Sequence, residues 1–261
     1  MTKARTVQRG RGFGIDIGGS GIKGAPVDLR AGSFAADRVR IPTPTPSTPE
    51  AVARVVGQIV RTFRRSSGRR PIGVTFPAVI QHGVARTAAN VDKAWIGVDV
   101  DAVFTEELRR PVHVVNDADA AGLAEARYGA ARGVSGIVIV CTLGTGIGTA
   151  LLLDGRLVPN TELGHLEIDG MDAEVRAAES ARERDDLSWE EWAKHVQRYF
   201  TVLEDLFWPD LFVVGGGVSK KHEKFLPLLH LRTPIVPASL RNGAGIVGAA
   251  LLAAEIGDAH A

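Results

Sequence analysis

Three glycine-rich turns hold the residues of this sequence that are best suited to binding phosphate. Glycine lets consecutive backbone N–H groups approach a tetrahedral anion without a Cβ clash. The turns comprise Gly18, Gly19, Ser20 and Gly21 in the first, Gly144, Thr145 and Gly146 in the second, and Gly215, Gly216 and Gly217 in the third. Asp16 and Lys23 flank the first turn, and Lys220 follows the third. These turns are predicted to bind phosphate, although each alone is also consistent with a simple tight turn.

Each glycine turn is expected at the end of a buried strand. Apolar strands are predicted over residues 13–17, 137–142 and 211–214. Alternating polarity continues past the first two turns, so strand, turn and returning strand occur once in each half of the chain. This repeat predicts an α/β fold of two related domains with a ligand held in a cleft between them. We expect a small domain of residues 1–116 plus a C-terminal helix at about 244–261, and a large domain of residues 117–243.

Helix start signals position further polar groups. Thr48 with Pro49, and Ser188 with Glu191, predict the first turns of two amphipathic helices. Asp117 follows a predicted strand at 112–115 and begins an alanine-rich helix. The positive end of that helix would keep the carboxylate of Asp117 ionised, and the alternative is that Asp117 only caps the helix.

Composition excludes several classes of protein. The chain has 31 Lys and Arg against 30 Asp and Glu, a net charge of +1, which argues against a nucleic-acid or anionic-membrane partner. A single cysteine, Cys141, excludes intrachain disulfides and fits a reducing compartment. The sequence lacks both an 18-residue apolar run and the apolar core of a signal peptide. These features predict a cytoplasmic protein.

Neither the Walker nor the Rossmann phosphate motif fits, because the spacing differs and the first turn does not open a helix. The turn motifs at residues 16–24, 143–148 and 213–218 resemble, in order and spacing, the two phosphate motifs and the adenosine loop of the sugar kinase, Hsp70 and actin superfamily. This resemblance implies the ribonuclease H-like two-domain α/β fold. It also implies that the first two turns hold the donor phosphates, that the third turn binds adenosine, and that Asp16 orients Mg²⁺ through water.

Two further segments resemble the signatures of the ROK sugar kinases: residues 116–121, which read NDADAA, and residues 162–165, which read ELGH. The resemblance implies that Asp117 is the catalytic base. It also implies hexose contacts by Asn90, Asn116, Asp117, Glu162, His165 and Glu179. The alternatives are a surface pair for Glu162 and His165 and a chance alignment for Glu179.

Many ROK proteins follow the ELGH segment with a cysteine-rich zinc loop, but residues 169–180 contain no cysteine, so structural zinc is not expected. Residues 182–189 and 208–221 resemble the polyphosphate-dependent glucokinases. That subgroup phosphorylates the 6-hydroxyl of glucose, and in some members mannose, from polyphosphate or ATP. Basic side chains past the third turn are candidates for a polyphosphate track, or for a merely solvated face: Lys220, Lys221, Lys224 and Arg241.

The resemblance leaves two other functions open. One is a strictly ATP-dependent hexokinase, and the other is a sugar-sensing regulator without catalysis. The family also implies a homodimer, although the long helix that begins after Ser188 is equally consistent with packing inside one chain.

Overall fold

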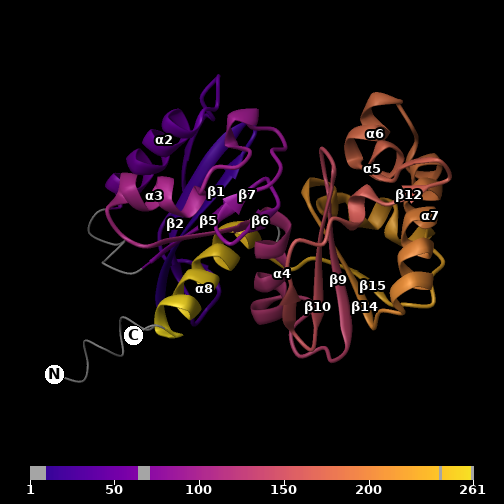
Figure 1. Ribbon diagram of the computed structural model, residues 1–261. Helices are drawn as coiled ribbons and strands as arrows, with labels where there is room; N and C mark the ends of the chain where they lie inside the picture. The colour runs from indigo at the N-terminus through magenta and orange to yellow at the C-terminus, as the bar shows by residue number, and fades with distance from the viewer. Residues whose placement is uncertain (1–9, 64–70, 241–242, 260–261) are drawn as a thin grey trace. The chain divides into compact units, whose positions relative to one another are not determined.

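The protein is an α/β protein built from two compact units, each with its own mixed sheet (Figure 1). A computed structural model describes residues 10–63, 71–240 and 243–259. The first unit comprises Met1–Ala124 with Gly243–Ala261, and the second comprises Glu125–Asn242. The first unit therefore continues past residue 116 into the helix that follows, and it is the longer of the two.

The sheet of the first unit has the strand order β3-β2-β1-β5-β8, with β4 paired to β2. β1 and β2 form an antiparallel hairpin closed by the Gly18–Gly21 pair, and β1 continues into parallel β5 and β8. The strand bounds are β1 Arg11–Gly18, β2 Gly21–Asp28, β3 Ser33–Phe34, β4 Val39–Ile41, β5 Ile72–Phe76 and β8 Val112–Asn116. The predicted strands at 13–17 and 112–115 are confirmed.

Helices cover both faces of this sheet. α2 (Pro49–Thr62) and α3 (Val100–Leu108) lie on one side, and α8 (Ala244–Ala259) lies on the other (Figure 1). Thr48 caps α2 by accepting a hydrogen bond from the N–H of Ala51, as predicted. α8 approaches the strands so closely that a Cβ at Gly73 would lie 1.8 Å from the carbonyl oxygen of Ala249.

This close approach gives a stability prediction. Gly73→Ala must displace α8 from the sheet, so we expect it to destabilise the protein by about 1–3 kcal/mol, the usual cost of overpacking a core. Thermal unfolding followed by circular dichroism measures the loss. Gly144→Ala is the control, because a Cβ at Gly144 meets nothing within 4 Å. Equal melting temperatures for the two variants would contradict the packing described here.

The sheet of the second unit has the order β11-β10-β9-β14-β15. β9 and β10 form an antiparallel hairpin around the second glycine turn, and β14 and β15 run parallel to β9. The strand bounds are β9 Ile137–Leu143, β10 Ile147–Leu153, β11 Arg156–Val158, β14 Leu211–Gly215 and β15 Ile235–Pro237. A glycine-tipped hairpin beside a parallel strand thus occurs in both units, which confirms the internal repeat.

One face of the second sheet packs against α7 (Trp189–Phe207), the long helix predicted from Ser188. Its capping box is present, with both reciprocal hydrogen bonds between Ser188 and Glu191. The opposite face packs against the last turn of α4 (Asp117–Tyr128) and the residues that follow it. In the described parts of the chain, no helix is long and apolar enough to cross a membrane.

Short elements around the second glycine turn were not predicted. They are η2 (Leu163–His165), the hairpin β12 (Glu167–Ile168) and β13 (Met171–Asp172), and helices α5 (Glu174–Ala177) and α6 (Glu179–Arg184). A 3-10 helix, η3 (Gly217–Lys224), follows the third turn. The remaining elements are the two-stranded β6 (Ile80–Gln81) and β7 (Val84–Ala85), η1 (Lys93–Trp95) and η4 (Leu226–Leu228).

Candidate functional site

The first glycine turn carries an ion pair at its base. Asp16 and Lys23 face each other across the β1–β2 hairpin, with 3.2 Å between Asp16 Oδ2 and Lys23 Nζ. The hydroxyl of Thr75 donates to Asp16 Oδ1 at 2.9 Å, because β5 pairs with β1 at this level. The carboxylate is therefore held by two donors while its side chain stays 23% exposed.

Two further residues lie against the first turn. A Cβ at Gly19 would lie 3.0 Å from the Cβ of Asn90, whose backbone adopts a left-handed conformation with φ of 59°. Arg40 donates through Nη2 to the carbonyl oxygen of Ser20 at 2.8 Å. Arg40 was not predicted, since the pairing of β4 with β2 that brings it to the turn leaves no local signal in the sequence.

Asn116 and Asp117 mark the step from β8 to α4. The Asn116 side chain bonds backbone groups: Nδ2 donates to the Ala78 carbonyl at 3.1 Å, and Oδ1 accepts from the N–H groups of Ala118 and Asp119 at 2.8 and 3.2 Å. Asn116 is thus buried and caps α4. Asp117 is exposed, although its Oδ1 also accepts from the N–H of Ala118 at 3.0 Å.

The second glycine turn is supported by side chains from α5 and α6. Glu174 Oε2 accepts from the N–H of Ile147 at 3.1 Å, and a Cβ at Gly146 would lie 2.3 Å from the same oxygen. Ser180 donates its N–H to the Gly144 carbonyl at 3.0 Å and its hydroxyl to the Thr145 carbonyl at 2.6 Å. Neither Glu174 nor Ser180 was predicted.

The third turn requires glycine. Gly216 has φ of +82°, and a Cβ there would lie 2.2 Å from the carbonyl oxygen of Leu143. Glu179 lies beside this turn, because a Cβ at Gly217 would lie 3.3 Å from Glu179 Oε2. Burial raises the pKa of Glu179, and the charge of Glu183 raises it further, while nearby Lys221 lowers it.

His165 ends η2 and Glu162 directly precedes it, and η2 packs on the start of β10. A Cβ at Gly164 would lie 2.0 Å from the Ile147 carbonyl, so only glycine permits this approach. His165 Nε2 lies 3.9 Å from Glu162 Oε2, while Nδ1 lies 2.8 Å from Asp172 Oδ2. The hydrogen bond with Asp172 raises the pKa of His165, and the negative charges of Glu174 and Glu162 add to this effect.

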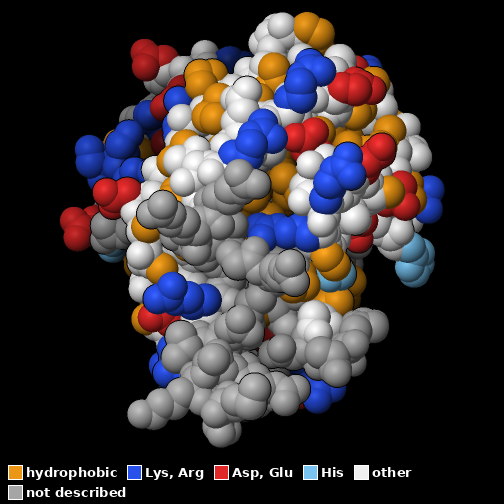
Figure 2. Space-filling model, turned by 90° about the vertical axis from the view of Figure 1, so that its left-hand side faces the viewer, with side chains coloured by type: hydrophobic (Ala, Val, Ile, Leu, Met, Phe, Trp, Pro, Cys, Tyr) orange, Lys and Arg blue, Asp and Glu red, His pale blue; other side chains and the backbone are white. Residues whose placement is uncertain are grey.

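Three basic side chains gather around the ring of Trp189, and two of them come from η3, directly after the third turn. The charged groups of Arg182, Lys224 and Lys221 lie 4.4, 5.5 and 5.7 Å from the ring centre of Trp189. Lys220 is exposed, and Arg241 lies outside the described residues. On the face shown in Figure 2, blue Lys and Arg side chains are interspersed with red Asp and Glu side chains.

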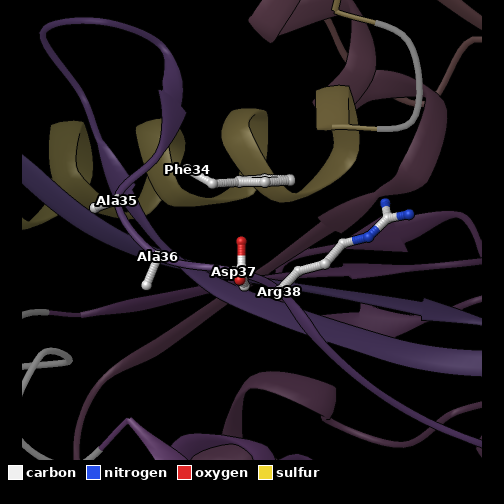
Figure 3. Close-up of a pocket in the computed structure, with 5 residues that line it drawn as sticks. All are labelled: Phe34, Ala35, Ala36, Asp37 and Arg38. Atoms are coloured by element: carbon white, nitrogen blue, oxygen red, sulfur yellow. The ribbon is translucent and has the colours of Figure 1, made fainter.

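An open pocket of about 540 Å³ lies on the loop between β3 and β4 (Figure 3). Its lining is one continuous segment: Phe34, Ala35, Ala36, Asp37 and Arg38. The ring of Phe34 also packs 3.3 Å from where a Cβ would stand at Gly243. The pocket includes none of the predicted site residues, and its two charged groups are solvent-exposed.

Most of the predicted site residues thus fall into one set in each unit, while Asn116 and Asp117 lie at the step from β8 to α4. In the first unit, the structure gathers Asp16, Lys23 and Asn90 at the first glycine turn. In the second unit, η2, α5 and α6 place His165 and Glu179 beside the second and third turns.

Comparison with known proteins agrees with this geometry. A family model described as "ROK family" matches residues 12–177. The chain is 53% identical over 251 residues to the polyphosphate glucokinase of Mycobacterium tuberculosis (strain CDC 1551 / Oshkosh), covering 96% of this chain and 93% of the relative.

Two solved structures extend the similarity to the fold. The inorganic polyphosphate/ATP-glucomannokinase of Arthrobacter sp. strain KM shares 60% identity at a TM-score of 0.90, covering 94% of this chain and 99% of the other. The ROK hexokinase of Thermus thermophilus shares 27% identity at a TM-score of 0.75, covering 96% and 100%. The predicted family resemblance and two-domain α/β fold are confirmed.

Proposed function

The chain belongs to the ROK family, and from this premise we propose that it is a kinase that transfers a phosphoryl group from polyphosphate or ATP to the 6-hydroxyl of glucose, and also of mannose. The observation that carries the proposal is the 60% identity, over 94% of the chain, to a polyphosphate/ATP-glucomannokinase. Phosphorus NMR of the purified product tests it, because a phosphate on carbon 6 of the hexose is expected. A phosphate on another carbon, or no product, would contradict it.

On the acceptor side, Asp117 is the proposed catalytic base. Its exposed carboxylate at the end of β8 is suited to accept the proton of the 6-hydroxyl as that oxygen attacks the donor. Glu162 and His165 are proposed to bind hexose hydroxyls, as are Asn90 and Glu179. Asn116 is proposed to contribute mainly by holding the start of α4, since its amide already bonds three backbone groups.

On the donor side, the backbones of the first two glycine turns are proposed to hold phosphate groups, with Thr145 as an added hydroxyl donor, and the third turn is proposed to bind the adenosine of ATP. Lys23 and Arg40 place positive charge beside the first turn. Charge neutralisation of this kind supplies most of the catalysis in phosphoryl transfer.

Mg²⁺ fits the residues present, because Asp16 offers the oxygen ligand that this ion prefers. Both oxygens of Asp16 already accept hydrogen bonds from protein donors, which favours contact through the water molecules that Mg²⁺ retains. When bound, the ion would offset the negative charge of the donor phosphates.

The basic cluster around Trp189 is proposed as part of a polyphosphate track, together with Lys220. It presents cations beside the third glycine turn, where a long donor chain would extend beyond the length of ATP. A polyanion needs such local charge because the net charge of the whole chain is only +1.

Removing two of these charges tests the track. We expect the double variant Lys221→Gln/Lys224→Gln to raise KM for polyphosphate roughly tenfold, from about 0.5–1 kcal/mol for each exposed charge. KM for ATP should change little. Lys194→Gln is the matched control, an exposed lysine on α7 in the same unit. Equal changes in KM for both donors would contradict the assignment.

We also propose a homodimer, as the family resemblance implies. Light scattering should return twice the mass of one chain, and a monomer mass at assay concentrations would contradict it.

A further inference from the structure

The ring of His165 has two nitrogens in different surroundings. Nδ1 lies 2.8 Å from Asp172 Oδ2, the distance of a strong hydrogen bond. Nε2 lies 3.9 Å from Glu162 Oε2, too far for a direct hydrogen bond. Two neighbouring sugar hydroxyls can therefore donate hydrogen bonds, one to Nε2 and one to Glu162, while Nδ1 is already engaged by Asp172.

The carboxylate of Asp172 is itself held in place. Asp172 ends the β12–β13 hairpin, where it pairs with Glu167, and its Oδ1 accepts from the N–H of Glu174 at 3.1 Å. The next residue, Ala173, donates its N–H to the Leu166 carbonyl at 2.9 Å, which ties the hairpin to the end of η2. One oxygen of Asp172 is thus used for the start of α5, and the other is directed at His165.

We propose that Asp172 is a positioning residue: by accepting a hydrogen bond from Nδ1–H of His165, it fixes the tautomer and orientation of the ring so that Nε2 is presented to the hexose. This inference rests on the proposed function for the identity of the ligand. A carboxylate fixes an imidazole in this way because a neutral ring carries only one N–H, and the nitrogen that donates it determines the nitrogen that accepts.

Glu174 contributes to the same arrangement from the side of the second glycine turn. Its Oε2 accepts from the N–H of Ile147, and its Oε1 lies 4.0 Å from His165 Nδ1. Among the described residues, the charged groups that act on the pKa of His165 are all acidic: Glu162 before η2, Asp172 on β13 and Glu174 on α5.

The test compares Asp172→Asn with wild type by ¹⁵N NMR of the histidine ring and by glucose kinetics. His165→Gln identifies the His165 signals among those of seven histidines. In wild type, the neutral ring should carry its proton on Nδ1. In the Asp172→Asn variant, the proton should shift toward Nε2, the midpoint of the His165 titration should fall, and KM for glucose should rise about tenfold, with a smaller change in kcat.

Asp169→Asn is the matched control. It removes a carboxylate of the same hairpin whose partner is Arg198, at 2.8 and 3.0 Å, and not His165. Its His165 spectrum and KM for glucose should match those of wild type. A chelator added to wild type should leave the spectrum unchanged, because a hydrogen bond and not a bound ion holds Nδ1.

Three results would each overturn the inference: a wild-type neutral ring protonated on Nε2, a spectrum that changes with the chelator, or an Asp172→Asn variant with unchanged tautomer and KM. The wild-type spectrum decides even if the variant does not fold. The NMR readout is independent of catalysis. A wild type that phosphorylates no hexose would refute the proposed function, but the NMR spectrum would still report which nitrogen of His165 carries the proton.

Discussion

Asp117→Asn is expected to lower kcat for glucose phosphorylation by roughly 10²–10⁴-fold, the usual contribution of a general base. The amide cannot take the proton of the 6-hydroxyl, whereas its size and shape are those of the carboxylate. The fold should persist, because Asp117 is exposed, its Asn replacement keeps the Oδ1 that accepts from the N–H of Ala118, and Asn116 supplies two further side-chain hydrogen bonds to the start of α4. Steady-state kinetics and thermal unfolding measure the two effects.

The control for Asp117→Asn is Glu50→Gln, an exposed acid in the first turn of α2. Both changes remove a negative charge near a helix N-terminus, where each costs about 0.3–1 kcal/mol of stability. If Asp117 were merely a helix cap, the two variants would lose similar amounts of stability, and both would keep the kcat of wild type. That pattern would remove Asp117 from the catalytic role.

Gly144→Ala is expected to reduce kcat/KM for both polyphosphate and ATP by about a hundredfold or more. The methyl group would occupy space at the second glycine turn that we assign to a donor phosphate. Nothing in the protein lies within 4 Å of that methyl group, so the melting temperature should stay close to that of wild type. KM for glucose should be less affected than KM for either donor.

Gly155→Ala, beyond the other end of β10, is the control, and the reverse pattern of effects is expected for it. It also meets nothing within 4 Å, but Gly155 has φ of +73°, so alanine there costs roughly 1 kcal/mol of backbone strain. We expect this variant to lose stability and keep donor kinetics. Normal donor kinetics for Gly144→Ala would mean that the second turn is only a hairpin.

Local patterns in the sequence were sufficient to predict the strands and helices that position the glycine turns. The strands at β1, β8, β9 and β14 and the starts of α2 and α7 depend on neighbours in sequence: apolar alternation, turn glycines and capping side chains. The internal repeat followed from the same signals, because each glycine-tipped hairpin is a local structure.

Contacts between distant elements could not be predicted in this way. Arg40 reaches the first turn through the pairing of β4 with β2, and Glu174 reaches Ile147 from 27 residues away. Asp172 lies seven residues from His165, but a hairpin that brings the two together has no periodic signature in such short strands. The buried capping role of Asn116 was likewise hidden, since it depends on the Ala78 carbonyl beyond a neighbouring strand.

The most direct test of the proposed function is the initial rate of hexose 6-phosphate formation by the wild-type protein, measured with polyphosphate or ATP as donor and glucose or mannose as acceptor. We expect product from both donors and with both sugars, and dependence on added Mg²⁺ in every case. Product from ATP alone would indicate an ordinary ATP-dependent hexokinase. No product from either donor, with sugar binding retained, would contradict catalysis and favour a sugar-sensing regulator.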